Sequence, residues 1–511
     1  MKEKLIEIIK REEIIDKYFE NPHDILELEL EEMGLSSIAY IKLLVLLETE
    51  FDIEFPDEYL QLYTFKSIQA IIDYISSIKE KSAMKDGYYL STYLHISGLA
   101  YCYHISARHN HNCSLWKKCG NQIKLVHFWE LERLTGQKHH AHSFYSYEHA
   151  KEFLNDLLST YNLSLEDMVE VWGTPGLETT RDYYFPDDSK KFAYHNIAHL
   201  FSAILSDVNI FNNNPVIGLS LDGGPDNVVD FEIKKKKHFI GSYSVNGEII
   251  DYFSVYSPGP LWNAAKEQFG MEEGSLMALA SASESRVNYP IDELVLCDDM
   301  KSTYKAIVYV KKLIGEISSL TDQDAGVKFN GYDQRFSKKD NNISMIMKII
   351  QQMSIEIMKL NIDMIIKKYN VIPEESFLSI AGGYALNCPS NSSIMNQYNF
   401  KGFYTVPCVS DSGISMGIAL YTFFKRMGKF DFKLGHAFYG DSDSRDLLKT
   451  LKQSGMEPFI KSLSEWEEEL AVKDVINSPI VWFDGQAEIR NMTGGGENGF
   501  IHQKTWVNGS K

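Results

Sequence analysis

Two short apolar segments, each ending in a pair of glycines, constrain the fold of this chain most strongly. "PVIGLSLDGG" ends in Asp222, Gly223 and Gly224, and "ESFLSIAGGYALN" runs through Gly382 and Gly383 into a helix start. An uninterrupted apolar run of this length is typical of a strand buried on both faces, and glycines after it allow backbone N–H groups to approach a phosphate. Because about 160 residues separate the two turns, we expect two related α/β lobes.

A pair of histidines on a predicted helix is a candidate metal site. "FAYHNIAHLFSAIL" places His195 and His199 four positions apart, so both imidazoles share one helical face and could bind one metal ion. Two buried histidines with ordinary hydrogen-bond partners would give the same spacing. A third ligand would have to come from elsewhere, and Asp411 in "PCVSDSGISMGIAL" is the best candidate.

The length and charge of the chain predict a small acidic module attached to a larger body. At 511 residues the chain exceeds what one hydrophobic core usually supports, so two or three domains are expected. The net charge is -19, and residues 1–80 contain 19 Asp and Glu against 8 Lys and Arg. Such an acidic chain is a poor non-specific ligand for nucleic acid.

The sequence predicts neither a secretory leader nor a membrane-spanning segment, because no window approaches about 18 uncharged apolar residues. The six cysteines are scattered through the chain, which favours free thiols over a disulfide framework. We expect a cytoplasmic protein with no membrane and no nucleic acid among its partners.

The acidic module, residues 1–80, is predicted to be an all-helical bundle. Apolar residues recur at helical spacing in "EKLIEIIKREEIIDKYF", "SSIAYIKLLVLLETEF" and "SIQAIIDYISSIKE", and we expect negative charge along the second of these helices. Ser36 and Ser37 stand at the start of that helix. Either could be its N-cap, and capping is compatible with a modification because a helix start is exposed.

The segment "MGLSSIAYIKLLVLLETEFDIEFPDE" resembles the central region of acyl carrier proteins. The resemblance implies a small four-helix carrier bundle in which a phosphopantetheinyl transferase attaches 4'-phosphopantetheine to Ser37. It also implies polyketide or nonribosomal peptide synthase components as partners. Ser36 stands where fatty-acid carriers have an aspartate, a position that small polar residues often take in secondary-metabolism carriers.

Seven segments of the larger body resemble, in order, the O-carbamoyltransferases of the nodulation and cephamycin type. They are "FWELERLTGQKHH", "YHNIAHLFSA", "LSLDGG", "YSPGPLWNAAKEQFGMEEGSLMALAS", "LSIAGGYALNCPSNSSI", "PCVSDSGISMGIAL" and "HAFYGDSDS". The resemblance covers about residues 88–489 and implies a two-lobed α/β domain of the actin-like ATPase type.

In that family the domain holds a carbamoyl adenylate derived from ATP, which an iron-type divalent metal helps to position for attack by a substrate hydroxyl. The metal ligands implied by the resemblance are His195, His199 and Asp411. The implied nucleotide site comprises Asp222, Gly223, Gly382, Gly383 and Asn387. The residues expected to approach the reacting end, as electrophile or base, are Lys138 and His139.

We expect a carrier domain over residues 1–80, a linker over 81–88 and the metal- and nucleotide-binding domain over 89–479. "IVWFDGQAEI" resembles the entrance to the family's second domain, which makes carbamoyl adenylate from carbamoyl phosphate and ATP. Residues after it do not resemble the continuation, so we expect 480–511 to be the start of a truncated activating domain. Either the adenylating domain is supplied in trans by a separate polypeptide, or this product cannot complete the reaction.

Two functions follow from these resemblances. The first is a biosynthetic enzyme that transfers a carbamoyl or related acyl group from an acyl adenylate to a hydroxyl of a carrier-tethered or free substrate. Tethering would raise the effective concentration of the acceptor. The alternative is a carrier protein fused to a non-catalytic carbamoyltransferase-like scaffold, inactive without a partner.

Two other polar segments are predicted to be structural. "RHNHNCSLWKKC" offers His109, His111, Cys113 and Cys119, but the spacing fits no strong zinc pattern. Lys234–Lys237 predict a solvated turn between strands, although such a run could instead dock an acidic carrier domain.

Overall fold

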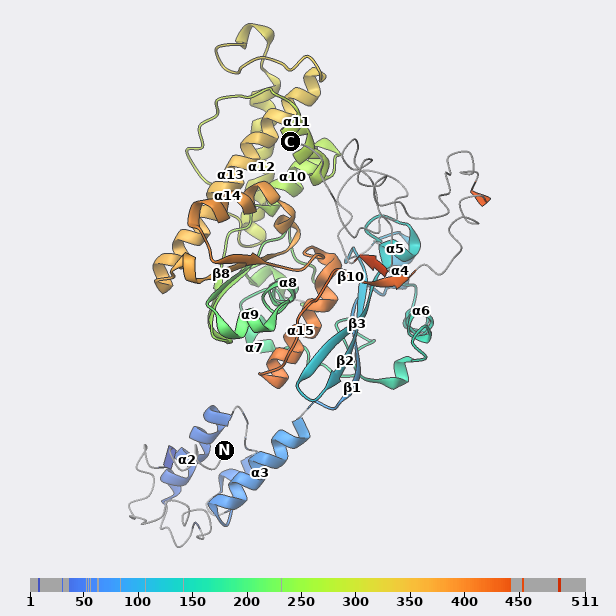
Figure 1. Ribbon diagram of the computed structural model, residues 1–511, viewed down its shortest axis with the longest axis vertical. Helices are drawn as coiled ribbons and strands as arrows, with labels where there is room; N and C mark the ends of the chain where they lie inside the picture. Colours follow the sequence, from blue (N-terminus) through green and yellow to red (C-terminus); the bar gives the residue numbers. More distant parts are fainter. Residues whose placement is uncertain are drawn as a thin grey trace, which may run out of the picture. The chain divides into compact units, whose positions relative to one another are not determined.

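The computed structural model describes residues 8–9, 30, 36–51, 53, 55, 57–61, 64–82, 84–105, 107–140, 142–230, 232–442, 453–454 and 486–488. The chain divides into two compact units, Met1–Lys85 and Asp86–Lys511, whose elements are labelled in Figure 1. Among the described residues, no helix combines the length and the apolar character that crossing a membrane requires.

The first unit is helical where it is described. Its elements are α2 (Ser37–Phe51), a 3-10 turn (Asp57–Leu60) and α3 (Ile68–Ser82). The inward residues of α2 recur at helical spacing, and they are Tyr40, Leu43, Leu44, Leu47 and Phe51. They share one core with Ile68, Ile71, Ile72 and Ile75 of α3. The first predicted helix lies outside the described residues except for Ile8 and Ile9, which belong to this core.

The outer face of α2 differs from the predicted acidic helix. Ile38, Ile41 and Val45 are exposed, Ile38 to 82%. The two glutamates of α2, Glu48 and Glu50, lie near its C-terminal end. The expectation of negative charge along the helix was therefore wrong for its first turns, where an apolar stripe follows Ser37.

The second unit, which we call the body, contains two sheets with a common pattern. The first sheet, in the order β3-β2-β1-β4, consists of β1 (Gly87–Tyr93), β2 (Asn112–Cys119), β3 (Gln122–Glu130) and β4 (Met168–Trp172). The second, in the order β7-β6-β5-β8-β9, consists of β5 (Val216–Ser220), β6 (Ile240–Val245), β7 (Glu248–Ser254), β8 (Phe377–Ala381) and β9 (Gly402–Tyr404). In each sheet an antiparallel three-stranded meander is extended by parallel pairing beside its first strand.

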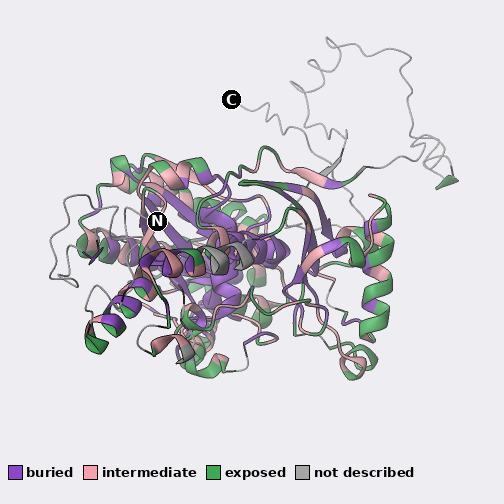
Figure 2. Cartoon of the chain, turned by 90° about the horizontal axis from the view of Figure 1, so that it is seen from below, coloured by how far each residue is buried: buried purple, intermediate pink, exposed green. Residues whose placement is uncertain are grey.

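Two helices lie between the sheets. α8 (Tyr194–Ile204) packs on β5 and β8, α15 (Ile414–Met427) packs on β1 and β2, and the two helices pack on each other. Every residue of α8 is buried, and Figure 2 shows the interior elements of the body as predominantly buried. The helices approach so closely that a Cβ at Gly417 would lie 1.9 Å from the carbonyl oxygen of Ala198.

The remaining helices surround this central stack. They are α4 (Gly98–Cys102), α5 (Leu131–Thr135), α6 (Tyr147–Ser159), α7 (Pro186–Ser189), α9 (Val208–Asn213), α10 (Gly259–Phe269), α11 (Glu273–Ala282), α12 (Met300–Ser318), α13 (Lys338–Tyr369) and α14 (Cys388–Tyr398). α10 to α13 pack together at one end of the body. β10 (Phe438–Ser442) and β11 (Gln486–Glu488) form a separate antiparallel pair.

Both glycine turns belong to the second sheet. β5 leads to Asp222 and β8 leads to Gly382, and these two strands pair in parallel along their full lengths. The two turns therefore do not mark two separate lobes, although their spacing suggested two lobes. Parallel neighbours require a crossover connection, and here that connection contains β6, β7 and the helices α10–α13. The two turns consequently meet at one edge of one sheet.

The lysine run is not a solvated turn throughout. Lys236 is buried and its ammonium pairs with Asp230. Lys237 Nζ lies 2.6 Å from Asp298 Oδ2. Lys236 thus pairs in the interior of the body and Lys237 forms an ion pair nearer its surface, which corrects the expectation of a solvated charge run for these two lysines.

Candidate active site

Four side chains that could ligate a metal ion converge in the interior of the body. They are His195, His199, Asp222 and Asp411. One ligand atom from each lies within 4.8 Å of the others, and all four residues are buried. The three metal ligands implied by the family resemblance thus lie together, and Asp222, expected at the nucleotide, joins them.

The Nε2 atoms of the two histidines face carboxylates of the cluster. His195 Nε2 lies 3.5 Å from Asp222 Oδ2 and 3.6 Å from Asp411 Oδ1, and His199 Nε2 lies 3.4 Å from the same Asp411 oxygen. Within the described part of the chain, His195 Nε2 and both ring nitrogens of His199 are buried without a hydrogen bond. Two imidazoles and two carboxylates are a donor set that suits Fe²⁺, Mn²⁺ or Zn²⁺. The residues present therefore fit an iron-type divalent ion.

Distant parts of the chain bring these ligands together. The histidines lie one turn apart on α8, and Asp222 is the second residue after the end of β5. Asp411 begins a 3-10 turn that leads into α15. Asn112, buried at the start of β2, donates from Nδ2 to the Asp411 carbonyl at 2.8 Å and accepts the Ser415 N–H at 3.0 Å. This asparagine therefore fixes the Asp411 turn to the first sheet.

Asp226 binds the ring nitrogen of His195 that faces away from the other ligands, and it was not predicted from the sequence. Its Oδ2 accepts a hydrogen bond from His195 Nδ1 at 2.8 Å and lies 3.1 Å from the Tyr93 hydroxyl. Arg108 Nε lies 3.4 Å from its other oxygen. Burial alone would raise the pKa of Asp226, but Arg108 and His195 hold that pKa well below its usual range. With Nδ1 donating to Asp226, His195 presents the lone pair of Nε2 to the other ligands.

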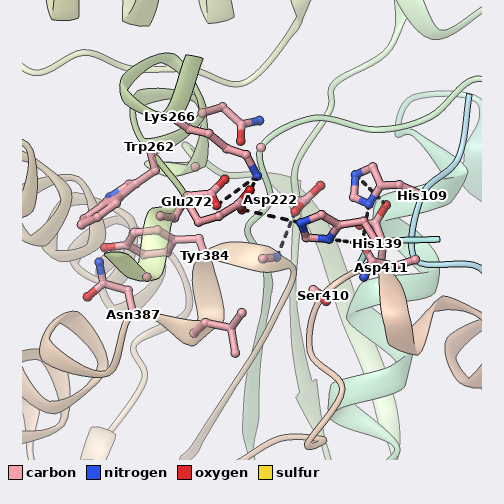
Figure 3. Close-up of a pocket in the computed structure, with 18 of the residues that line it drawn as sticks. His109, His139, Asp222, Trp262, Lys266, Glu272, Tyr384, Asn387, Ser410 and Asp411 are labelled. Carbon is pink, nitrogen blue, oxygen red and sulfur yellow. Dashed lines mark hydrogen bonds and ion pairs between the residues drawn. The ribbon is translucent and has the colours of Figure 1, made fainter. Parts of the chain in front are cut away.

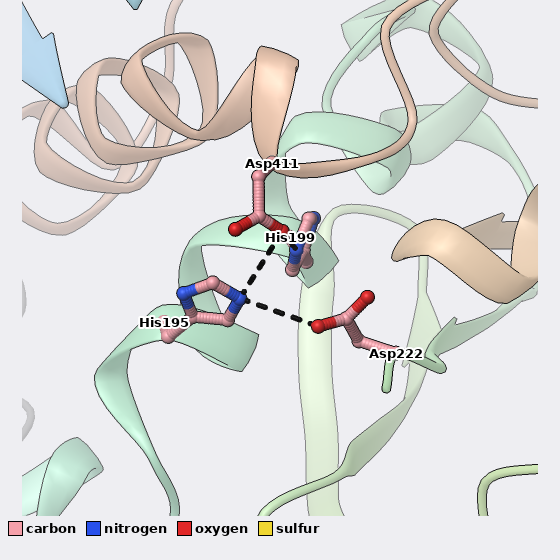
Figure 4. Close-up of side chains that lie close together, drawn as sticks. All are labelled: His195, His199, Asp222 and Asp411. Carbon is pink, nitrogen blue, oxygen red and sulfur yellow. Dashed lines mark ion pairs between the residues drawn. The ribbon is translucent and has the colours of Figure 1, made fainter. Parts of the chain in front are cut away.

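A cavity of about 230 Å³ opens beside the cluster. Seven predicted site residues line it: Lys138, His139, Asp222, Gly223, Gly383, Asn387 and Asp411. Gly382 and the two histidines of α8 are not among its lining residues. Figure 3 shows two ends, one with His109, His139 and Asp411 and one with Trp262, Tyr384 and Asn387.

The two glycine turns are joined through Asp222. Gly383 N–H donates to Asp222 Oδ1 at 2.9 Å, and Gly224 N–H donates to Oδ2 at 3.3 Å. These two backbone donors, which the sequence suggested for a phosphate, are therefore engaged by a carboxylate. Gly382 has φ of +90°, and a Cβ there would lie 2.2 Å from the Leu221 carbonyl oxygen.

His139 is held in an unusual backbone conformation at the cavity wall. Its φ is 65°, in the left-handed region that residues other than glycine rarely adopt. The His139 N–H donates to Glu132 Oε2 at 2.6 Å, and the His139 carbonyl accepts the Asn110 N–H. Burial and nearby Lys266 lower the pKa of His139, so its imidazole is neutral near pH 7.

His109 and Asn110 complete this end of the cavity and were missed as site residues. Asn110 Oδ1 lies 2.5 Å from His109 Nδ1 and 3.3 Å from His139 Nδ1, so it can accept from both rings. His109 Nε2 then faces Asp411 Oδ2 at 3.6 Å. The Asp411 carboxylate raises the pKa of His109. Within the described residues, His109, His111, Cys113 and Cys119 form no metal cluster.

Lys138 belongs to a charged group at the rim. Its Nζ lies 3.8 Å from Glu272 Oε1, and His139 Nε2 lies 3.6 Å from Glu272 Oε2. Lys266 Nζ lies 2.8 Å from Glu272 Oε2 and 3.2 Å from Glu273 Oε2. Two ammonium groups thus stand at the cavity with carboxylates as their present partners.

The two serines at the start of α2 have different roles in the structure. Ser36 Oγ accepts the Ala39 N–H at 3.1 Å, the geometry of an N-cap. Ser37 makes no such capping bond among the described residues, and its side chain is exposed. The cap is therefore Ser36, which leaves the Ser37 hydroxyl available.

Residues 130–420, more than half of the chain, match the family described as carbamoyltransferase N-terminus. The chain belongs to this carbamoyltransferase family. Residues 4–75 match the phosphopantetheine attachment site family, so the N-terminal unit is a carrier domain. Both resemblances stated from the sequence are confirmed.

A curated relative and two solved structures are also similar. Over 52 residues the chain is 46% identical to an aminoacyl carrier protein of Agrobacterium fabrum, covering 10% of this chain and 63% of the relative. The chain thus spans less than two thirds of that carrier. Component A of the Acidaminococcus fermentans (R)-2-hydroxyglutaryl-CoA dehydratase is 13% identical, with a TM-score of 0.35, covering 66% of this chain and 99% of its own. The ADPNP-bound activator of the Clostridium difficile 2-hydroxyisocaproyl-CoA dehydratase is 12% identical, with a TM-score of 0.32 and coverages of 74% and 100%.

Proposed function

We propose that the protein transfers a carbamoyl or related acyl group from an acyl adenylate to a hydroxyl of a carrier-bound or free acceptor in a biosynthetic pathway. The observation that carries this proposal is the single cavity onto which both Asp411 of the candidate metal centre and the His109–Asn110–His139 group open. The common strand order of the two sheets supports a two-lobed fold of the actin-like ATPase type.

The candidate ligands would hold a divalent ion at the inner wall of the cavity. His195, His199, Asp222 and Asp411 supply the donors, and a bound ion of the iron type would screen phosphate charge and polarise the acyl group. Lys138 and Lys266 line the same cavity, where their ammonium groups complement an adenylate phosphate. The carboxylates that now pair with them would share them with that phosphate.

The proposed transfer step uses the protonation states of His109 and His139 at their end of the cavity. The acceptor hydroxyl oxygen forms a bond to the carbamoyl carbon, and the bond from that carbon to the phosphate oxygen breaks, so AMP leaves with the electron pair. The hydroxyl proton passes to Nε2 of His139, whose lowered pKa leaves it neutral. His109, whose pKa Asp411 raises, is placed to donate a hydrogen bond to the developing negative charge.

The alternative is a carrier domain on a non-catalytic scaffold. It shares the arm at Ser37 with the enzyme and differs only in the body, where no turnover would occur. Cavity variants therefore distinguish the two functions, whereas the carrier domain alone does not.

The experiment begins with intact mass after incubation with coenzyme A and a broad-specificity phosphopantetheinyl transferase. We expect a gain of one phosphopantetheine in the wild type and in Ser36→Ala, and none in Ser37→Ala, because Ser36 is the cap and Ser37 the exposed hydroxyl. Modification of Ser37→Ala would contradict the assignment of the attachment site.

The loaded protein is then given carbamoyl phosphate, ATP and a separate adenylating domain, with candidate hydroxy-acyl chains on the arm. Carbamoylation that His139→Gln slows by about 100-fold, within the range of a lost general base, would support the enzyme. Full modification of Ser37 without transfer to any tethered or free hydroxyl would favour the scaffold.

A further inference from the structure

A second cavity adjoins the first and contributes no residue to the proposed transfer step. It measures about 430 Å³ and lies between α10, α11, α13 and the segment that follows α11. Trp262 and Met277 line both cavities. Gln351 of the second cavity exchanges hydrogen bonds of 3.2 and 3.0 Å with Asn387 of the first. The two spaces thus share one wall.

Carboxylates outnumber lysines in the lining of the first cavity, whereas the charged residues described in the lining of the second cavity are cations only. The first contains four carboxylates, from Asp222, Glu272, Glu273 and Asp411. The described residues that line the second include Arg286 and Lys348 but no Asp or Glu. In a chain with a net charge of -19, a cavity that presents only cations favours an anionic ligand.

The two cations are placed differently. Lys348 is half-buried, and its Nζ donates to the carbonyl oxygens of Ser283 and Ser285 at 2.7 and 2.6 Å, so uncharged groups fix it in place. Arg286 is exposed, and its guanidinium forms no ion pair with any described carboxylate. Its backbone is fixed, because the Arg286 N–H donates to Asn330 Oδ1 at 2.5 Å. Arg286 therefore presents an unpaired fork of donors at a defined position on the rim.

The proposed transfer needs two substrates, an acyl adenylate and an acceptor. An acceptor on a carrier always brings a phosphodiester, followed by a long chain with two amides. The second cavity offers a cation at its rim, amide groups from Gln351 and Gln352, and an apolar wall that includes Trp262. The exposed Arg286 suits the phosphate, the glutamine amides suit the amides of the arm, and the buried Trp262 suits its carbon chain.

We infer that the second cavity binds the pantetheine arm of a carrier-bound acceptor, with the phosphate at Arg286 and the acyl end directed past Trp262 and Met277 toward the first cavity. This inference rests on the proposed function, since it names the path of its acceptor. A phosphate could also come from a free nucleotide, and the experiment separates these two sources.

The test measures binding by isothermal titration to full-length Ser37→Ala protein, which carries no arm of its own. The probes are 4'-phosphopantetheine, pantetheine without the phosphate, and AMP. We expect 4'-phosphopantetheine to bind about tenfold more tightly than pantetheine, as one charge-assisted contact to phosphate provides. Adding Arg286→Gln should abolish that difference and leave AMP binding unchanged.

Arg335→Gln is the matched control, because Arg335 is also exposed but pairs with Asp333 and lies outside the cavity lining. It should leave the affinity for 4'-phosphopantetheine unchanged. Equal binding of the two pantetheine probes, or a loss in Arg335→Gln as large as in Arg286→Gln, would overturn the inference. Weaker AMP binding in Arg286→Gln would assign the cavity to the nucleotide instead. The assay needs no turnover, so its result is independent of whether carbamoyl transfer occurs.

Discussion

Replacing Asp226 by asparagine tests whether the buried histidine–carboxylate cluster is a metal centre. The substitution keeps the size of the side chain but removes the charge that accepts the His195 Nδ1–H at 2.8 Å. His195 then loses the partner that fixes its tautomer and orients Nε2 toward Asp222 and Asp411. Loss of such a partner typically lowers metal affinity about 10- to 100-fold, which corresponds to about 1.4–2.7 kcal/mol.

The same substitution also affects folding, and the two effects can be separated. Asp226 pairs with Arg108, whose side chain is 2% exposed. Arg108 Nη1 still donates to the Leu94 and Gly173 carbonyls at 3.1 and 2.9 Å, so the guanidinium is not left without acceptors. We expect a loss of about 1–3 kcal/mol in the free energy of unfolding, below the 3–5 kcal/mol of a fully broken buried pair.

The assay is titration of the folded protein with Fe²⁺ under anaerobic conditions, repeated with Zn²⁺ and Mn²⁺, and urea denaturation of the same samples. Asp188→Asn is the control. Like Asp226, Asp188 accepts a hydrogen bond from a tyrosine hydroxyl (Tyr421, 2.5 Å) and pairs with a cation (Lys425, 2.9 Å), but it contacts no histidine of the cluster. It should lose stability but bind metal like the wild type. Equal metal affinity in Asp226→Asn and the wild type would refute the reasoning.

Two further predictions concern stability. Gly382→Ala would place a Cβ 2.2 Å from the Leu221 carbonyl oxygen at a φ of +90°, so we expect it to lose about 2–3 kcal/mol of unfolding free energy. Gly224→Ala, with nothing within 4 Å of its Cβ, should lose less than about 1 kcal/mol. Equal losses of the two variants in urea denaturation would contradict this prediction. Burial lowers the pKa of His111 well below its usual value, and burial with His142 lowers the pKa of His140 to about 4. From pH 6.5 downward to about 4 the unfolded chain therefore binds protons that the folded chain does not, and stability should fall with decreasing pH by at most about 1.4 kcal/mol per pH unit for each histidine, less for the partly exposed His140. Denaturation of the wild type and of His140→Gln at pH 7 and pH 5 measures this contribution. The fall should be smaller in His140→Gln, and an equal fall in both proteins would count against it.

The sequence predicted the parts of the site that lie on regular elements. His195 and His199 share a helix face because their spacing is four residues, and Asp222 follows a strand because the apolar run ends there. Asp411 was the best candidate for a third ligand from its segment, and the family resemblance implied the same residue. These residues are local features of helix and strand, which periodicity and turn chemistry report directly.

The parts that were missed depend on contacts between distant segments. Asp226 reaches His195 from a loop, and Asn112 fixes the Asp411 turn across 299 positions of sequence. A lone asparagine or aspartate in a loop looks like ordinary turn chemistry. The pairing of β5 with β8 was misjudged for a similar reason, since a parallel partner 160 residues away leaves no local pattern.

The charges around the cluster favour a bound cation over protonated histidines. Asp222, Asp226 and Asp411 are three buried carboxylates, and Arg108 directly offsets only Asp226. Desolvating two further negative charges costs several kcal/mol unless a positive charge compensates them. A protonated His199 could provide one through Nε2, which lies 3.4 Å from Asp411 Oδ1, but its Nδ1 would then be a buried donor without a hydrogen-bond acceptor in the described structure. A divalent ion between the carboxylates would compensate both charges and coordinate one nitrogen from each histidine, which leaves fewer buried polar atoms without a partner.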